Sequence, residues 1–183
     1  MKIRRILSVL LTVFALFALS SCSGKTDVPK GMKLASDTSI VDYSLFVPKS
    51  WIIDVSNGAT MAHVSESDHS SVSVAQWNLT DEISSIDAWW EIIYKEQTGE
   101  VFTDITVTTE GEKTVVDGKA ASKYVYSAKL GENKYPFMVV ATVRNGSIYV
   151  ITYTSIGEID DENSLFSKNL ETVNSIIENF RFN

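Results

Sequence analysis

Apolar and polar residues alternate along most of the chain from residue 43 onward, a pattern typical of β-strands that bury one face. The alternating segments predict strands at 43–47, 51–55, 59–65, 72–77, 105–109, 114–116, 120–128, 135–143 and 148–154. Asp117-Gly118 and Asn145-Gly146 each separate two such segments. These dipeptides are strong hairpin signals because both central residues of the favoured turn need a positive φ. The second half of the sheet is therefore expected to be antiparallel.

Two segments have a helical period instead. In the first, the apolar residues recur at i, i+3, i+4, i+7 and i+8, namely at Ile86, Trp89, Trp90, Ile93 and Tyr94. The second lies near the end of the chain, with apolar positions at Phe166, Leu170, Val173, Ile177 and Phe180. Together the strands and helices predict an α+β fold, an antiparallel sheet with helices packed on its faces.

The first residues follow the charge and hydropathy order of a secretory signal. Lys2, Arg4 and Arg5 precede an apolar run over 6–19, and small residues follow before Cys22. The run is shorter than the roughly 18 residues that a membrane-spanning helix needs. We expect this segment to be cleaved and the mature chain to be anchored to the membrane. The alternatives are an uncleaved membrane helix and a secreted protein without an anchor.

The residues before Cys22 resemble the lipobox of bacterial lipoproteins. The resemblance implies that a diacylglyceryl group is attached to the Cys22 thiol and that the chain is cut before this residue. Two or three acyl chains hold a protein stably on a bilayer, whereas one chain binds only marginally. We therefore expect a lipid anchor on the extracytoplasmic side of the cell membrane.

The expected organisation is a signal peptide over 1–21, a lipidated cysteine and flexible tether over 22–42, and one folded domain over 43–183. The tether is predicted because this segment is polar and weakly patterned. Cys22 is the only cysteine, so the domain has no intramolecular disulfide and its stability must come from the core.

The charge of the chain argues against some partners. The net charge is −7, and removal of residues 1–21 takes away three basic residues and no acidic one, which leaves −10. Such a surface repels nucleic acid and anionic lipid. No nucleic-acid partner is expected, and attachment to the membrane is credited to the lipid.

The predicted strand, turn and strand over 43–51 (YSLFVPKSW) resemble the opening of the PsbP-like family, named for the extrinsic lumenal protein of photosystem II. Residues 118–126, 149–155 and 176–182 extend the resemblance over most of the chain from residue 43. It implies an αβα sandwich around a central antiparallel sheet. It also implies an assembly or accessory role, since proteins of this wider fold are not recognised as enzymes.

Two clusters could hold metal ions. His63 and His69 are the only histidines, and with Asp68 and Glu66 they lie in one short stretch that could bind zinc. Members of the resembled family can bind divalent metals, which adds slight support to a zinc site; the alternative is that these residues form a solvated hairpin tip.

The second cluster is the run Asp160-Asp161-Glu162, which could bind calcium but lacks the spacing of an EF-hand loop. Acidic residues before a helix are also favourable without any ion.

Aromatic residues suggest packing or a binding surface. Trp89 and Trp90 point about 100° apart on a helix, so they either pack at the two edges of its apolar stripe or form part of a binding surface. Tyr124, Tyr126, Tyr149 and Tyr153 occupy alternating strand positions, which predicts a cross-strand aromatic ladder.

The sequence contains no recognisable catalytic set. It has no Gly-x-Ser-x-Gly motif, and its one cysteine is assigned to the lipid. The expected function is therefore a non-catalytic accessory, assembly or protein-binding factor of the cell envelope, with no cofactor and with an envelope protein as partner. The alternative is a lipoprotein that binds a small molecule or a metal ion. A partner-binding domain should expose an apolar patch with a polar rim, and a ligand receptor should have an enclosed pocket.

Overall fold

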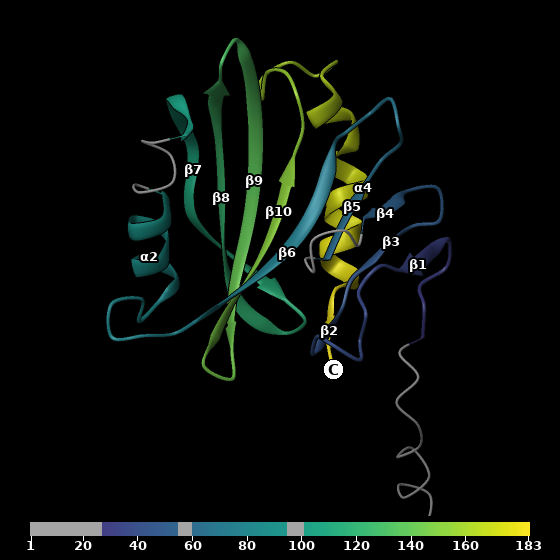
Figure 1. The fold of residues 1–183 in the computed structure, drawn as a ribbon, viewed down its shortest axis with the longest axis vertical. Helices are drawn as coiled ribbons and strands as arrows, with labels where there is room; N and C mark the ends of the chain where they lie inside the picture. Colours follow the sequence, from purple (N-terminus) through teal and green to yellow (C-terminus); the bar gives the residue numbers. More distant parts are fainter. Residues whose placement is uncertain (1–26, 55–59, 95–100) are drawn as a thin grey trace, which may run out of the picture.

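A seven-stranded antiparallel sheet in the order β4-β5-β6-β10-β9-β8-β7 forms the centre of the molecule (Figure 1). The computed structural model describes residues 27–54, 60–94 and 101–183. The strands of the sheet are β4 (Ile52–Asp54), β5 (Thr60–His63), β6 (Ser71–Asn78), β7 (Thr103–Val116), β8 (Lys119–Leu130), β9 (Asn133–Arg144) and β10 (Ser147–Thr154).

Both predicted hairpin turns are present. Asp117 and Gly118, which join β7 to β8, have φ values of 47° and 71°, and Asn145 and Gly146, which join β9 to β10, have 50° and 77°. Left-handed backbone at both central positions matches the right-handed twist of the flanking strands. The two segments predicted at 105–109 and 114–116 are parts of one strand, β7, whose pairing with β8 shifts register three times.

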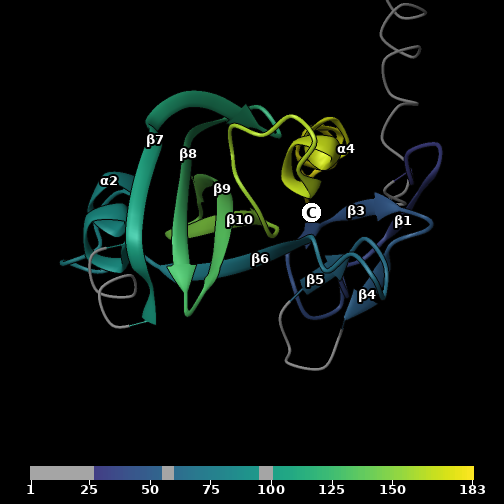
Figure 2. The same cartoon turned by 90° about the horizontal axis from the view of Figure 1, so that it is seen from above.

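Helices cover both faces of the sheet. The first is α2 (Ile86–Trp89), which continues as one π-helical segment, η1 (Trp90–Tyr94), and the second is α4 (Leu165–Asn179). On one face Trp89 and Trp90 pack against β8, β9 and β10, and on the other Phe166, Val173 and Ile176 pack against the alternate residues of the sheet. Figure 2 shows α2 beside β7 and α4 near β10 and β3. This is the αβα arrangement that the resemblance implies.

Two short strand pairs extend the α4 side of the fold. β1 (Met32–Leu34) pairs with β3 (Phe46–Pro48), and β2 (Tyr43–Ser44) pairs with β11 (Arg181–Phe182).

The folded domain begins earlier than the predicted boundary at Tyr43, because β1 lies inside the segment expected to be a tether. Met32 is 9% exposed and Ser36 5%. The Ser36 hydroxyl donates to the carbonyl of Tyr43 and accepts from the amide of Leu45, both at 3.0 Å. A strand of three residues is too short to show alternation, so the pattern did not reveal it.

The predicted tyrosine ladder is wrong. Tyr124 and Tyr126 lie on the face covered by α2, whereas Tyr149 and Tyr153 lie on the face covered by α4. β9 also separates β8 from β10, so the two tyrosine pairs are not on neighbouring strands.

Within the described ranges, no helix has the length and hydropathy that crossing a membrane requires. The predicted signal peptide and Cys22 lie outside the described residues.

Candidate functional site

A groove of about 580 Å³ lies where α2 begins, at the end of the sheet that carries the β7–β8 turn. One wall is the chain that leads into α2, with Leu79, Ser84, Ser85, Ile86 and Asp87. The other wall is the sheet itself, with Lys113 from β7, Ala120 and Ser122 from β8, and Val143 from β9. Most of these lining residues are exposed, so the groove is open along its length rather than enclosed.

Two groove-lining residues, Ala120 and Val143, belong to an apolar row that crosses this end of the sheet. Val115 pairs with Ala120 across β7 and β8, and Val143 pairs with Ile148 across β9 and β10. Because Ala121 pairs with Thr142, Ala120 and Val143 are the next positions along β8 and β9. Val115 is 61% exposed and Val143 36%, whereas Ile148 is 0% exposed. The row thus continues the buried core of this face out to solvent.

One serine and one threonine hydroxyl fix the wall on the α2 side. Ser85 is the N-cap of α2, and its hydroxyl accepts a hydrogen bond of 3.0 Å from the amide of Ala88. Thr80 accepts another of 3.0 Å from the amide of Ile83, which closes the loop before the helix. These are the side-chain bonds expected at a helix start, and they hold this wall at the edge of the apolar row.

Lys113 and Lys119 line the groove without a carboxylate partner among the described residues, unlike three other lysines of β8 and β9. Lys123 lies 2.9 Å from Glu112, Lys129 lies 2.7 Å from Asp104, and Lys134 pairs with Glu158. By contrast, Lys113 reaches only the hydroxyl of Ser122 at 3.4 Å, and no ion pair within the described residues includes Lys113 or Lys119.

Tyr124 connects the groove to the core. Its hydroxyl donates to Oδ1 of Asp87 over 3.4 Å. Burial, reinforced by the nearby Asp87 carboxylate, raises the pKa of Tyr124 to about 12. The tyrosine therefore remains a neutral donor at physiological pH, and it ties Asp87 to the sheet.

The two tryptophans are core residues and do not form an exposed binding surface. Trp89 is 5% exposed and Trp90 4%. Trp90 stacks on Tyr124 with ring centroids 4.2 Å apart, and its indole N–H donates to Oε1 of Glu110 over 3.1 Å. The structure thus supports the packing alternative, in which these rings hold α2 beside the groove. The indole N–H of Trp89 is buried and has no hydrogen-bond partner among the described residues.

The structure brings the two histidines together but adds no third ligand. The rings of His63 on β5 and His69 in the following loop have centroids 6.1 Å apart. The carboxylate of Asp68 instead accepts hydrogen bonds from the amide of Ser70 at 2.9 Å and from Asn169 at 3.3 Å. In the described part of the chain, no group of three histidine, cysteine or acidic side chains is placed to hold a metal ion.

The acidic run before α4 is explained by local structure. Oδ1 of Asp161 accepts a hydrogen bond of 2.8 Å from the amide of Asn163, and Ser164 caps the helix by accepting from the amide of Ser167. Asp160, Asp161 and Glu162 are all exposed. Their position ahead of a helix N-terminus is favourable without a bound ion.

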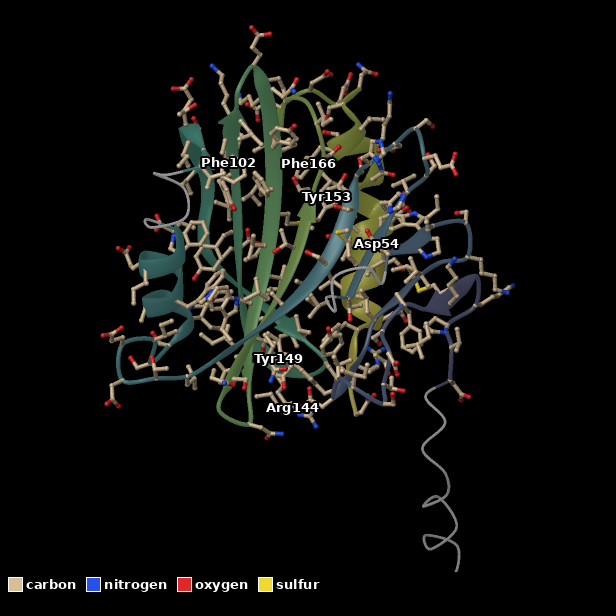
Figure 3. All side chains as sticks on the ribbon, viewed as in Figure 1. Asp54, Phe102, Arg144, Tyr149, Tyr153 and Phe166 are labelled. Atoms are coloured by element: carbon tan, nitrogen blue, oxygen red, sulfur yellow. The ribbon has the colours of Figure 1, made fainter. Side chains whose placement is uncertain are left out.

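A polar network at the other face of this sheet end was not anticipated from the sequence. The hydroxyl of Tyr149 lies 2.9 and 2.8 Å from the two carboxylate oxygens of Asp42. Arg144 donates to the Asp42 carbonyl over 3.0 Å, and its guanidinium lies 4.8 Å from the centre of the Phe182 ring. Figure 3 shows Tyr149 and Arg144 together at this end. The network joins β9, β10 and β11 to the start of β2 and is structural in character.

Sequence reasoning also missed the groove. Its lining comes from the loop before α2 and from three strands, so no local motif contains it. The one available signal was the presence of apolar residues next to the predicted turns, at Val115 and Val143.

Comparisons with known proteins identify the fold. No protein-family model and no curated protein sequence matches the chain. The solution structure of cyanobacterial PsbP (CyanoP) from Synechocystis sp. PCC 6803 is similar, with 15% identity, a TM-score of 0.57, and coverage of 91% of this chain and 99% of that one. The Ran-binding protein Mog1p of Saccharomyces cerevisiae is similar at 12% identity and a TM-score of 0.57, covering 82% of this chain and 96% of that one. At such identities the likeness establishes the fold alone, and the chain has the PsbP-like α+β fold.

Proposed function

We propose that this protein is a lipid-anchored, extracytoplasmic accessory factor whose non-catalytic domain binds a protein of the cell envelope through the groove beside α2. The observation that carries the proposal is the open apolar row with charged groups at its rim. An exposed apolar surface framed by polar groups is typical of a protein-binding site, whereas small-molecule receptors bury most of the ligand.

Two further observations support this function. The residues before Cys22 resemble a lipobox, which favours attachment to a membrane. Mog1p, which has the same fold, is described as Ran-binding, so a protein partner is compatible with this architecture. Anchoring raises the effective concentration of the domain near its partner, and a modest interface can then suffice.

The test is crosslinking of the intact protein in its own membranes, followed by affinity capture. We expect one envelope protein to be recovered in stoichiometric amount, with crosslinks at lysines near the groove such as Lys113. The Cys22→Ala variant should leave the membrane fraction, lose acyl-chain labelling and lose this partner. Recovery of no specific protein would contradict the accessory role, and persistent acyl labelling of the variant would contradict the anchor.

A metal-binding role is the second candidate, because the structure brings His63 and His69 together. Two imidazoles can serve as zinc ligands. If the pair binds zinc, calorimetric titration of the protein with zinc should give saturable heat that the His69→Ala variant loses. A titration without saturable heat removes this candidate.

A further inference from the structure

We infer that the groove beside α2 binds an extended segment of the partner protein in which an apolar side chain is adjacent to a carboxylate. The inference rests on the proposed function, and it specifies which chemistry the partner presents. Three features carry it: an apolar row that reaches the edge of the sheet, two lysines without internal partners, and a wall that is fixed in place.

The first feature determines the shape of the ligand. β7 is the last strand of the sheet, and Val115 on this strand is 61% exposed, so the apolar row runs from the groove to the open edge. A free small molecule in this place would leave much of its surface in water. A chain segment can lie along the row and continue past the edge while it buries Val115, Ala120 and Val143.

The second feature determines the charge of the ligand. Lys123, Lys129 and Lys134 each face a carboxylate of this chain, so their charges are already compensated. Lys113 and Lys119 line the groove without such a partner among the described residues, in a chain whose net charge is −7. An acidic side chain on the ligand would complement them, and charge complementarity of this kind selects partners and fixes register.

The third feature explains why the site needs little rearrangement. The Ser85 cap holds the start of α2, the stacking of Trp90 on Tyr124 holds the first residue of η1, and Tyr124 holds the Asp87 side chain. A preformed site loses less conformational entropy when it binds a ligand. The fixed Asp87 carboxylate also disfavours ligands that carry acid along their whole length, so the ligand acid should lie on the side of the β7–β8 hairpin.

The experiment selects ligands from a random peptide library displayed on phage, with the full chain in detergent micelles as the immobilised target. The wild type should enrich peptides that carry Asp or Glu beside a large apolar residue. The Lys113→Glu variant should weaken the binding of the best such peptide about tenfold, and a new selection on this variant should enrich Lys or Arg instead. Val143→Asp should abolish binding of the wild-type peptides.

Matched controls separate the groove from general effects of the substitutions. Val107 is 36% exposed, the same as Val143, and lies outside the groove, so Val107→Asp should leave peptide binding unchanged. Lys168→Glu makes the same charge reversal on the exposed side of α4 and should also have no effect. Circular dichroism and urea unfolding of each variant verify that the fold is retained.

Several outcomes would overturn the inference. These are enrichment of peptides without acid, binding that Lys113→Glu and Val143→Asp leave intact, and no enrichment at all. Self-association of the wild type that Val143→Asp removes would show instead that this face joins two copies of the chain. If membrane crosslinking captures an envelope protein equally well with both groove variants, the accessory role stands, but its assignment to the groove fails and this inference fails with it. If crosslinking captures no partner, the accessory role itself fails.

Discussion

Tyr149 shows how a single buried hydroxyl links the stability of the domain to pH. The side chain is 1% exposed, and its hydroxyl donates to the Asp42 carboxylate. Burial and this hydrogen bond raise the pKa of Tyr149 to about 12. Burial likewise raises the pKa of Tyr153 to about 12. In the unfolded chain a tyrosine loses its proton near pH 10.

These shifts predict alkaline destabilisation. Between about pH 10 and about pH 12 the unfolded chain binds fewer protons than the folded one, so the free energy of unfolding falls as the pH rises. Below about pH 10 both tyrosines are protonated in the folded and in the unfolded chain, so their contribution to the free energy of unfolding is fully present. Urea unfolding at several pH values should show this decline, and Tyr149→Phe should make it shallower. The variant should also lose about 1 kcal/mol at neutral pH with the hydrogen bond to Asp42. An unchanged pH slope in Tyr149→Phe would contradict the assignment.

At the residue scale, the sequence identified which side chains are large and apolar but not what they face. Trp89 and Trp90 were correctly placed on a helix, and their burial had to come from the structure because both edges of the apolar stripe reach the sheet. The contact of Asp42 with Tyr149 joins residues 107 positions apart, and no local pattern encodes such a pair.

At the scale of elements, β1 is the strand that changes the predicted boundary between tether and folded domain. It turns part of the expected tether into folded structure through its pairing with β3. Its two apolar side chains differ in burial, with Met32 9% exposed and Leu34 36%.

The different burial of Met32 and Leu34 gives a matched pair of substitutions. Met32→Ala removes a buried side chain and should cost about 2 kcal/mol in the free energy of unfolding. Leu34→Ala removes a side chain that is four times as exposed as Met32 and should cost less, about 1 kcal/mol. Urea unfolding of the full chain measures both. If the two variants were equally stable and matched the wild type, this segment would be a tether after all.

Elements whose sequence signals lie within a few neighbouring residues were predicted well. The two Asp-Gly and Asn-Gly turns and the C-terminal helix follow from residues that are close in sequence, since turn geometry and helical period are local properties. The interruption predicted within β7 was wrong because Gly111, with φ of 65°, allows an irregular pairing without ending the strand. Register shifts of this kind depend on the partner strand, which sequence alone does not identify.

At the scale of the whole molecule, the fold class followed from the sequence and the candidate site did not. Alternation, turns and two helical stripes suffice to predict an antiparallel sheet with helices on its faces. The groove forms only because α2 stops short of the row that contains Val143, and this depends on where the helix docks. The uncompensated charge of Lys113 became visible only when the strand register showed which lysines meet a carboxylate.

The position of β1 has a further consequence, which concerns reach. β1 and α2 lie at opposite ends of the molecule (Figures 1 and 2), so the groove is remote from the point where the chain enters the fold. Ten positions separate Cys22 from Met32, and a fully extended chain of this length spans at most about 35 Å. With Cys22 lipidated as proposed, the length of this segment limits how far the domain can move from the bilayer. A partner whose acidic segment lies beyond that distance is inaccessible to it, whatever the affinity of the groove.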